Sequence, residues 1–272
     1  LLDGGSTHVL GLRQERNPAF PGMTAPEPIT RNLGALADAV TIGGADVGLA
    51  TDGDADRLGV IDENGVFVDQ HQTFALLCYY LLEYKQERGP IVRSVTSTRM
   101  IDRLGAVYGV PVYETPVGFK YLGPKMLETK AMAAGEESGG YAFSNHLPER
   151  DGCFAGLLLL DLLARSNKSL SELVKELYSK VGEHFYDRID VHLTPEQRDA
   201  ALERLATVAP RTVAGRSVTG QDTKDGFRFE LDKGWLLIRP SGTEPLLRIY
   251  TEVTDFDLVQ PVLNAGRELA GV

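Results

Sequence analysis

The chain has 272 residues, of which 43% are hydrophobic and 24% are charged, so it can bury more than one core and is not a disordered polypeptide. Its net charge of −10 argues against general binding to nucleic acid or to an anionic membrane surface. The longest apolar run, CFAGLLLLDLLA, is too short to span a bilayer. The cysteines, Cys78 and Cys153, match no metal spacing, so we expect buried thiols and a cytoplasmic protein.

The first third of the chain alternates short apolar runs with polar loops. These runs predict strands at 47–50, 58–61 and 66–68, with a tight turn at 63–65. Residues 72–86, QTFALLCYYLLEYKQ, have helical spacing and end before a Gly-Pro pair. We expect a domain boundary there, so that residues 1–88 form the first unit.

The middle of the chain alternates predicted strands with predicted helices. We expect strands at 91–95 and 110–113, and helices at about 98–108, 119–130, 154–165 and 170–181. Such an alternation is typical of βαβ units around a parallel sheet. Residues 89–184 are therefore predicted to form a second α/β unit.

The pattern changes after residue 184. A strand is expected at 185–193, and Thr194 and Pro195 then open a helix as N-cap and first helical residue. Short strands near 216–219, 226–231, 234–239 and 246–252 precede a final helix from about 256. Helices segregated from a run of strands predict an α+β domain over residues 185–272.

Three aspartates, Asp52, Asp54 and Asp56, lie two residues apart between the first two predicted strands. Carboxylate oxygens suit Mg²⁺ or Ca²⁺, and three ligands leave coordination positions open for a phosphate oxygen. An EF-hand loop has similar spacing, but Arg57 stands where its turn requires glycine. A haloacid-dehalogenase-type phosphatase, with the first aspartate as nucleophile, and a solvated acidic turn are further alternatives.

Glu136, Glu137 and Ser138 lie in a glycine-rich loop, GEESGG, where the backbone can approach a ligand closely. Their acceptors and donor suit the vicinal hydroxyls of a sugar. An acidic turn at a helix N-terminus is the alternative interpretation. Lys120 lies where a glycine turn opens a helix, a place that disfavours cations, so it is either exposed or meets an anionic ligand.

Arg239, Ser241 and Thr243 lie in the segment IRPSGTEPLLRIY, between two predicted strands. Together with the backbone amides around Gly242, they form a cluster of donors that suits a phosphate dianion. Arg248, on the next strand, could face the same site. A hairpin turn with proline and glycine would explain the same residues without a ligand.

These loops, in this order, resemble those of the α-D-phosphohexomutases of the phosphoglucomutase/phosphomannomutase type. TDGDADR looks like the family's magnesium loop, GEESGG its sugar loop and RPSGTEP its phosphate loop, while ETPVGFKY is similar to the segment with a substrate-contacting lysine. The resemblance covers essentially the whole chain. It implies α/β/α domains with mixed sheets and helices on both faces, followed by an α+β domain.

The resemblance also implies what is missing. The family's catalytic serine lies in a Thr-Ala-Ser-His-Asn-like loop of a first domain, and this sequence has no such stretch. We therefore expect the end of domain 2 in residues 1–88, domain 3 in 89–184 and domain 4 in 185–272. The chain begins with leucine, which suggests part of a longer polypeptide, and the isolated chain is expected to be inactive.

The implied reaction interconverts hexose 1-phosphate and hexose 6-phosphate through a phosphoserine and a hexose 1,6-bisphosphate. The resemblance assigns Mg²⁺ to the three aspartates, sugar hydroxyls to Glu136 and Ser138, and the unreacting phosphate to Arg239, Ser241, Gly242, Thr243 and Arg248. Arg57 would neutralise the transferring group. Some bacterial relatives have histidine where this chain has Gly140, so Lys120 and His146 are the remaining candidates for proton transfer. Phosphoglucosamine mutase, a phosphatase, and a sugar-phosphate or calcium-binding module are the alternatives.

Overall fold

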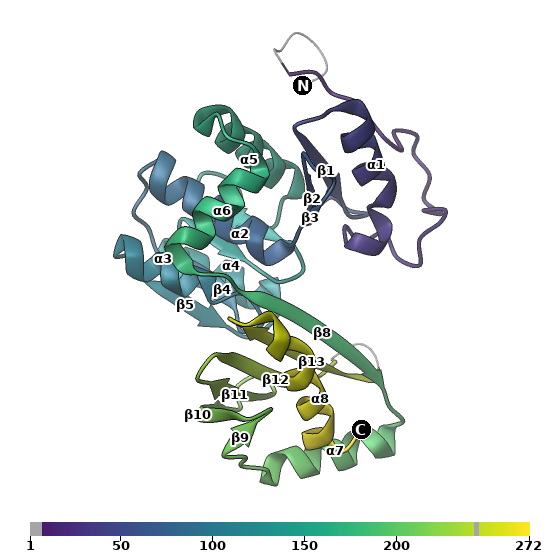
Figure 1. The fold of residues 1–272 in the computed structure, drawn as a ribbon, viewed down its shortest axis with the longest axis vertical. Helices are drawn as coiled ribbons and strands as arrows, with labels where there is room; N and C mark the ends of the chain where they lie inside the picture. The colour runs from purple at the N-terminus through teal and green to yellow at the C-terminus, as the bar shows by residue number, and fades with distance from the viewer. Residues whose placement is uncertain (1–6, 242–244) are drawn as a thin grey trace.

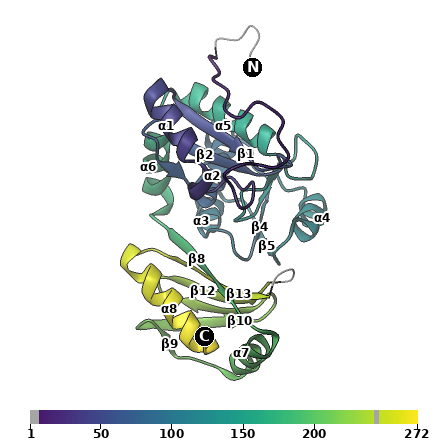
Figure 2. The same ribbon diagram turned by 90° about the vertical axis from the view of Figure 1, so that its right-hand side faces the viewer.

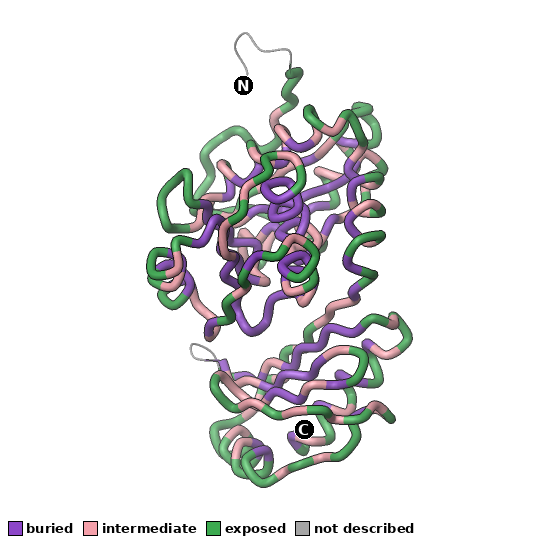
Figure 3. The backbone as a smooth tube through the Cα atoms, turned by 90° about the vertical axis from the view of Figure 1, so that its left-hand side faces the viewer, coloured by how far each residue is buried: buried purple, intermediate pink, exposed green. Residues whose placement is uncertain are grey.

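The computed structural model describes residues 7–241 and 245–272, which form two bodies stacked along the long axis (Figure 1). The upper body contains the elements up to residue 181, and the lower body contains those from residue 185 onward. Buried segments run through the centre of the upper body and along the strands of the lower one (Figure 3). Each body therefore has a hydrophobic core of its own.

The first sheet carries the acidic loop. It contains β1 (Val47–Thr51), β2 (Leu58–Asp62) and β3 (Phe67–Val68), which are antiparallel in that order. A short 3₁₀ turn, η1 (Thr30–Asn32), leads into α1 (Gly34–Gly43), whose side chains pack on β1 and β2. The predicted strands at 47–50 and 58–61 are confirmed, and residues 52–57 form the loop between them.

The second sheet has the order β5-β4-β6-β7, with β4 (Ile91–Ser94), β5 (Val112–Thr115), β6 (Ala133–Gly135) and β7 (Tyr141–Phe143). β4, β5 and β6 are parallel, connected by α3 (Met100–Tyr108) and α4 (Phe119–Thr129), whereas β7 is antiparallel to β6. The expected parallel sheet is therefore parallel only in part, because a short hairpin reverses the chain after β6. Val92 packs with α4 and Ile91 with the opposite core, so both faces are covered.

A helix buried on all sides lies at the centre of the upper body. It consists of α2 (Gln70–Tyr79) and a π-helical turn, η2 (Tyr80–Tyr84), and its residues 74–82 are each at most 2% exposed. It packs against α3, α5 (Gly152–Ser166) and α6 (Leu170–Val181), all of which follow it in the chain. The predicted boundary after Arg88 would separate this helix from the three later helices that it packs against.

The lower body is an antiparallel sheet with the order β8-β13-β12-β11-β10-β9 (Figure 2). The bounds of its elements are β8 (Phe185–His192), α7 (Pro195–Thr207), β9 (Thr212–Val213), β10 (Arg216–Asp222), β11 (Phe227–Leu231), β12 (Gly234–Pro240), β13 (Leu246–Val253), the 3₁₀ turn η3 (Phe256–Leu258) and α8 (Val259–Ala270). Leu236 and Ile238 face α8, while Trp235 and Leu237 pack with Val95 of the upper body. Both faces of β12 are thus buried, which explains its unbroken apolar run.

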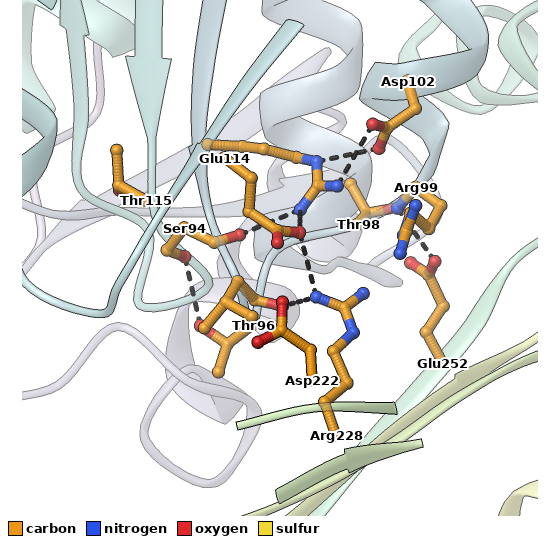
Figure 4. A network of polar contacts seen from close by, with 12 residues as sticks. Ser94, Thr96, Thr98, Arg99, Asp102, Glu114, Thr115, Asp222, Arg228 and Glu252 are labelled. Carbon is orange, nitrogen blue, oxygen red and sulfur yellow. Dashed lines mark hydrogen bonds and ion pairs between the residues drawn. The ribbon is translucent and has the colours of Figure 1, made fainter. Parts of the chain in front are cut away.

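A charged network joins the two bodies (Figure 4). Glu114 of β5 accepts from Arg93 at 2.7 Å and from Arg228 of β11 at 2.9 Å, and both arginine side chains are 2% exposed. Arg93 also pairs with Asp102, and Arg228 donates to the carbonyl of Val95 at 3.1 Å. One carboxylate therefore connects two buried guanidinium groups from different bodies.

A second contact between the bodies centres on Glu252 of β13, which is 2% exposed. The carboxylate accepts from the backbone N–H of Arg99 at 2.9 Å (Figure 4) and lies 3.0 Å from Nδ1 of His184. Arg99 pairs in addition with Glu230 of β11 at 2.6 Å. The start of α3 is thereby held against the lower sheet.

Two expectations made from composition can be checked. Cys78 is buried, but Cys153 is exposed on the first turn of α5, so the expectation of two buried thiols is wrong for Cys153. Among the described residues, no helix is long and apolar enough to cross a bilayer.

Candidate functional site

The acidic loop brings its three carboxylates together. One oxygen each from Asp52, Asp54 and Asp56 lies within 4.8 Å of the others, and Ala55 adopts a positive φ of 64° in the turn between them. Burial, with the charges of Asp56 and Asp54, raises the pKa of Asp52 to about 6, although the backbone N–H of Arg57 opposes this. The cluster thus carries unfavourable repulsion that a bound cation would relieve.

The donor set fits a hard divalent cation. All three groups offer carboxylate oxygens, and Oδ1 of Asp56 is buried without a hydrogen-bond partner among the described residues. Strands β1 and β2 flank the loop, so the EF-hand interpretation, which requires helices, is wrong. Arg57 lies beside the cluster, with Nε 3.5 Å from Asp52 and 3.6 Å from Asp56.

The loop that is expected to bind sugar, residues 135–140 (the sugar loop), lies directly against the acidic loop. Leu58 donates its N–H to the carbonyl of Gly139 at 3.0 Å, and Arg57 forms a β-bridge with Gly140. Gly139 has a φ of +93°, and a Cβ there would lie 2.8 Å from the carbonyl oxygen of Leu58. Glycine is therefore required at residue 139 for the two loops to meet.

Glu136 is 5% exposed and accepts from the N–H of Gly118 at 2.9 Å. Burial and the charge of Glu137 raise its pKa to about 7, despite the opposing charges of Arg150 and Arg57. A carboxyl group with this pKa can exchange a proton near neutral pH. Ser138 is half-buried in the same turn.

Glu137 is held differently from Glu136. Its carboxylate accepts from the hydroxyl of Ser94 at 3.2 Å and from that of Thr96, in the loop after β4. β4 and β6 are neighbouring parallel strands whose connections leave in opposite directions, and ligands bind outside the carboxyl ends of strands at such a point. Glu137 therefore anchors the sugar loop to the edge of the sheet where a ligand is expected.

Arg150, which is not among the residues predicted from the sequence, belongs to the site. Its guanidinium lies 2.7 Å from Asp56, and a Cβ on Gly140 would lie 2.4 Å from its Cδ. Gly140 therefore provides the space that Arg150 occupies. No local pattern identifies this arginine, because it reaches Asp56 from 94 positions further along the chain.

Lys120 is exposed in the first turn of α4, next to an open groove of about 480 Å³. The groove is also lined by Phe119 and Arg150. His146, by contrast, is engaged at the start of α5, where Nε2 lies 2.8 Å from Asp151 and the ring stacks on Phe154. The structure therefore brings Lys120 to the groove, whereas it joins His146 to a helix cap.

Arg239 and Arg248 lie directly opposite each other on β12 and β13. Like charges at such a pair are unfavourable unless an anion or acids compensate them. Arg239 pairs with Asp225 at 2.8 Å, and Arg248 lies 3.9 Å from Asp190. Ser241 is 7% exposed just beyond β12, while Gly242 and Thr243 lie outside the described residues.

Family models match most of the chain, in the order expected from the loops. They are described as phosphoglucomutase/phosphomannomutase alpha/beta/alpha domain II over residues 2–65, alpha/beta/alpha domain III over 69–181, and C-terminal domain over 189–265. The domain III match begins just before α2, in line with the packing of that helix.

The chain is similar to curated proteins of about twice its length. It is 33% identical to a phosphoglucomutase/phosphomannomutase of Thermococcus kodakarensis, covering 96% of this chain and 55% of the relative. It is 32% identical to a probable phosphoglucosamine mutase of Pyrococcus abyssi, covering 89% and 52%. The crystal structure of a candidate phosphomannomutase from Thermus thermophilus matches with a TM-score of 0.77 and 37% identity, over 91% of this chain and 51% of that structure.

Proposed function

From the premise that this chain belongs to the phosphoglucomutase/phosphomannomutase family, we propose that it forms the metal- and sugar-phosphate-binding part of a phosphohexomutase. The observation that carries this proposal is the direct contact between the acidic loop and the sugar loop, through Arg57, Leu58, Gly139 and Gly140. This contact supports the proposal, because it brings three carboxylates suited to a divalent cation next to polar groups suited to a hexose. Structures of N-acetylphosphoglucosamine mutases, which share the fold, contain GlcNAc-6P with magnesium or glucose 1,6-bisphosphate.

The proposed reaction interconverts hexose 1-phosphate and hexose 6-phosphate by phosphoryl transfer from and to a serine outside this sequence. Mg²⁺, held by Asp52, Asp54 and Asp56, would supply positive charge where the phosphoryl group is transferred. Arg57 and Arg150, which contact the same carboxylates, add positive charge there and hold the loop in shape. The two arginines would stabilise the negative charge of the phosphoryl group electrostatically, in a site that is formed before the substrate binds.

The remaining residues bind and orient the substrate. Glu136 and Ser138 are proposed to hold sugar hydroxyls, and Arg239, Ser241 and Arg248 the phosphate that does not react. Lys120, on the rim of the groove, is the better placed of the two proton-transfer candidates. His146 would first have to leave Asp151.

Phosphoglucosamine mutase is the second candidate function. Relatives with this name match the chain almost as well as the one named phosphoglucomutase/phosphomannomutase. The sequence GEESGG favours a glucose- or mannose-type substrate, because the glucosamine branch tends to have glutamine in this loop.

Calorimetric titration of this chain in magnesium buffer tests the proposed function. We expect glucose 6-phosphate and mannose 6-phosphate to bind, and glucosamine 6-phosphate to bind more weakly. Arg239→Ala should weaken binding about 10- to 100-fold, because it removes charge-assisted hydrogen bonds to the phosphate. Arg198→Ala, on the exposed face of α7, is the matched control. Preference for glucosamine 6-phosphate would support the second candidate, and equal binding by both variants would contradict the assignment of Arg239.

Magnesium should stabilise the chain through the acidic loop. Mg²⁺ at about ten times its dissociation constant is expected to raise the melting temperature by about 3–6 °C. Asp54→Asn should abolish this shift, whereas Asp46→Asn, an exposed residue just before β1, should leave it intact. Differential scanning calorimetry with and without Mg²⁺ measures the shift in melting temperature of each variant. An unchanged shift in Asp54→Asn would mean that the ion binds elsewhere.

A further inference from the structure

Asp225, in the turn between β10 and β11, contacts both bodies of the molecule. Its Oδ1 accepts from Nε of Arg239 at 2.8 Å, and its Oδ2 accepts from the backbone N–H of Val117 at 2.7 Å. The Asp225 and Arg239 side chains are only 17% and 18% exposed, so solvent screens this pair weakly. One carboxylate thus connects the proposed phosphate-binding arginine to the segment before α4.

The turn is built for this approach. Gly226 has a φ of +97°, and a Cβ there would lie 2.7 Å from the carbonyl oxygen of Ile238 and 3.1 Å from Cβ of Arg239. Any other residue at position 226 would push the turn away from β12. Gly226 therefore brings Asp225 to Arg239.

The segment before α4 continues the connection to the sugar loop. Val117 donates its N–H to Asp225, and the next residue, Gly118, donates its N–H to Glu136 at 2.9 Å. Two consecutive N–H groups thus donate hydrogen bonds to carboxylates from different loops. The two N–H groups belong to adjacent peptide planes that share the Cα of Val117, so a movement of one donor displaces the other unless φ and ψ of Val117 compensate. Gly118, with a φ of +119°, allows this arrangement.

We propose that Asp225 is a positioning residue that couples Arg239 to the sugar loop through Val117 and Gly118. This inference rests on the proposed function for Arg239 and Glu136. A ligand that contacts both Arg239 and the sugar loop would bind more tightly because of the coupling. A ligand that contacts only one of them would bind no more tightly. Asp225 would in this way favour a hexose phosphate over a free phosphate ion of the same charge.

Amide hydrogen exchange of the ligand-free chain tests the coupling itself. Asp225→Ala should speed exchange at Val117 at least about tenfold and at Gly118 several-fold. Asp225→Asn, which keeps the size of the side chain, should have a smaller effect at both amides and guards against a variant that fails to fold. Asp222→Asn, which lies near the same turn, is the matched control and should change neither amide. A change confined to Val117 would overturn the proposal.

Calorimetric titration with inorganic phosphate and with glucose 6-phosphate tests its consequence for binding. Asp225→Asn should weaken the binding of both ligands. The loss of affinity for glucose 6-phosphate should be about five times the loss of affinity for inorganic phosphate. Equal losses for the two ligands would mean that Asp225 only steadies Arg239, which overturns the coupling. If the unaltered chain binds neither ligand, the proposed function fails, and hydrogen exchange alone decides whether the loops are coupled.

Discussion

Replacing Glu114 with alanine should lower the free energy of unfolding by about 3 kcal/mol, because two buried guanidinium groups each lose a charge-assisted hydrogen bond. Glu114 is shared by Arg93 and Arg228, whose side chains are each 2% exposed. Arg93 would keep its pair with Asp102 and Arg228 its pair with Glu230, but the carboxylate that joins the two arginines across the bodies would be lost. The melting temperature should fall by about 6–12 °C, measured by calorimetry.

The matched control for this substitution is Glu128→Ala on α4. Glu128 pairs with Lys125 at 3.0 Å, but its side chain is 68% exposed, so its loss should cost well under 1 kcal/mol. Because Glu114 connects the two bodies, its loss should also separate their unfolding into two calorimetric transitions. A melting curve for Glu114→Ala that matches that of Glu128→Ala would show that the network contributes no stability.

Replacing Glu252 with glutamine should remove an equally large, pH-dependent contribution to stability. Burial by itself would raise the pKa of Glu252, but hydrogen bonds from His184 and Thr98 and electrostatic interactions with His184 and His71 lower it from 4.5 to about 2. A pKa that is lower in the folded state stabilises the fold above the unfolded value. The contribution, about 3 kcal/mol at pH 7, should be lost as the pH falls from about 4.5 to about 2.

Thermal unfolding of both proteins between pH 2 and pH 7 measures this contribution as a difference. The gap in stability between the unaltered chain and Glu252→Gln should be widest above pH 4.5 and should close toward pH 2. Glu183→Gln, next to His184 but exposed, is the control for removing a carboxylate nearby. A gap that stays constant over this range would show that Glu252 contributes through packing and not through its charge.

The parts of the site that the sequence predicts are local. Three aspartates between two short apolar runs indicate a loop between strands. The signals for strands and turns can be recognised because they extend over only a few residues of sequence. The glycine-rich sugar loop is recognisable for the same reason. For the phosphate loop, Arg239 and Arg248 were expected on adjacent strands, and the structure places them opposite each other on β12 and β13.

The parts that could not be predicted depend on contacts distant in sequence. Arg150 reaches Asp56, and Asp225 reaches Val117 across 108 positions. Neither contact produces a local pattern in the sequence, because the packing of whole helices and strands brings the two residues together. The predicted single helix at 72–86 likewise ends early in a π-helical turn, where Tyr80 bonds to Asp161 of α5. Tertiary packing there overrides helical propensity.

The order of strands in the lower sheet has a consequence for synthesis of the chain. β8 is the first strand of that sheet to be made, yet it pairs only with β13, the last one, from Phe185↔Val253 to His192↔Leu246. On a ribosome, β8 must therefore wait without a partner while some fifty further residues are translated. An unpaired strand of this kind is prone to wrong pairing with other chains, so the interval before β13 emerges is when this protein most needs a chaperone.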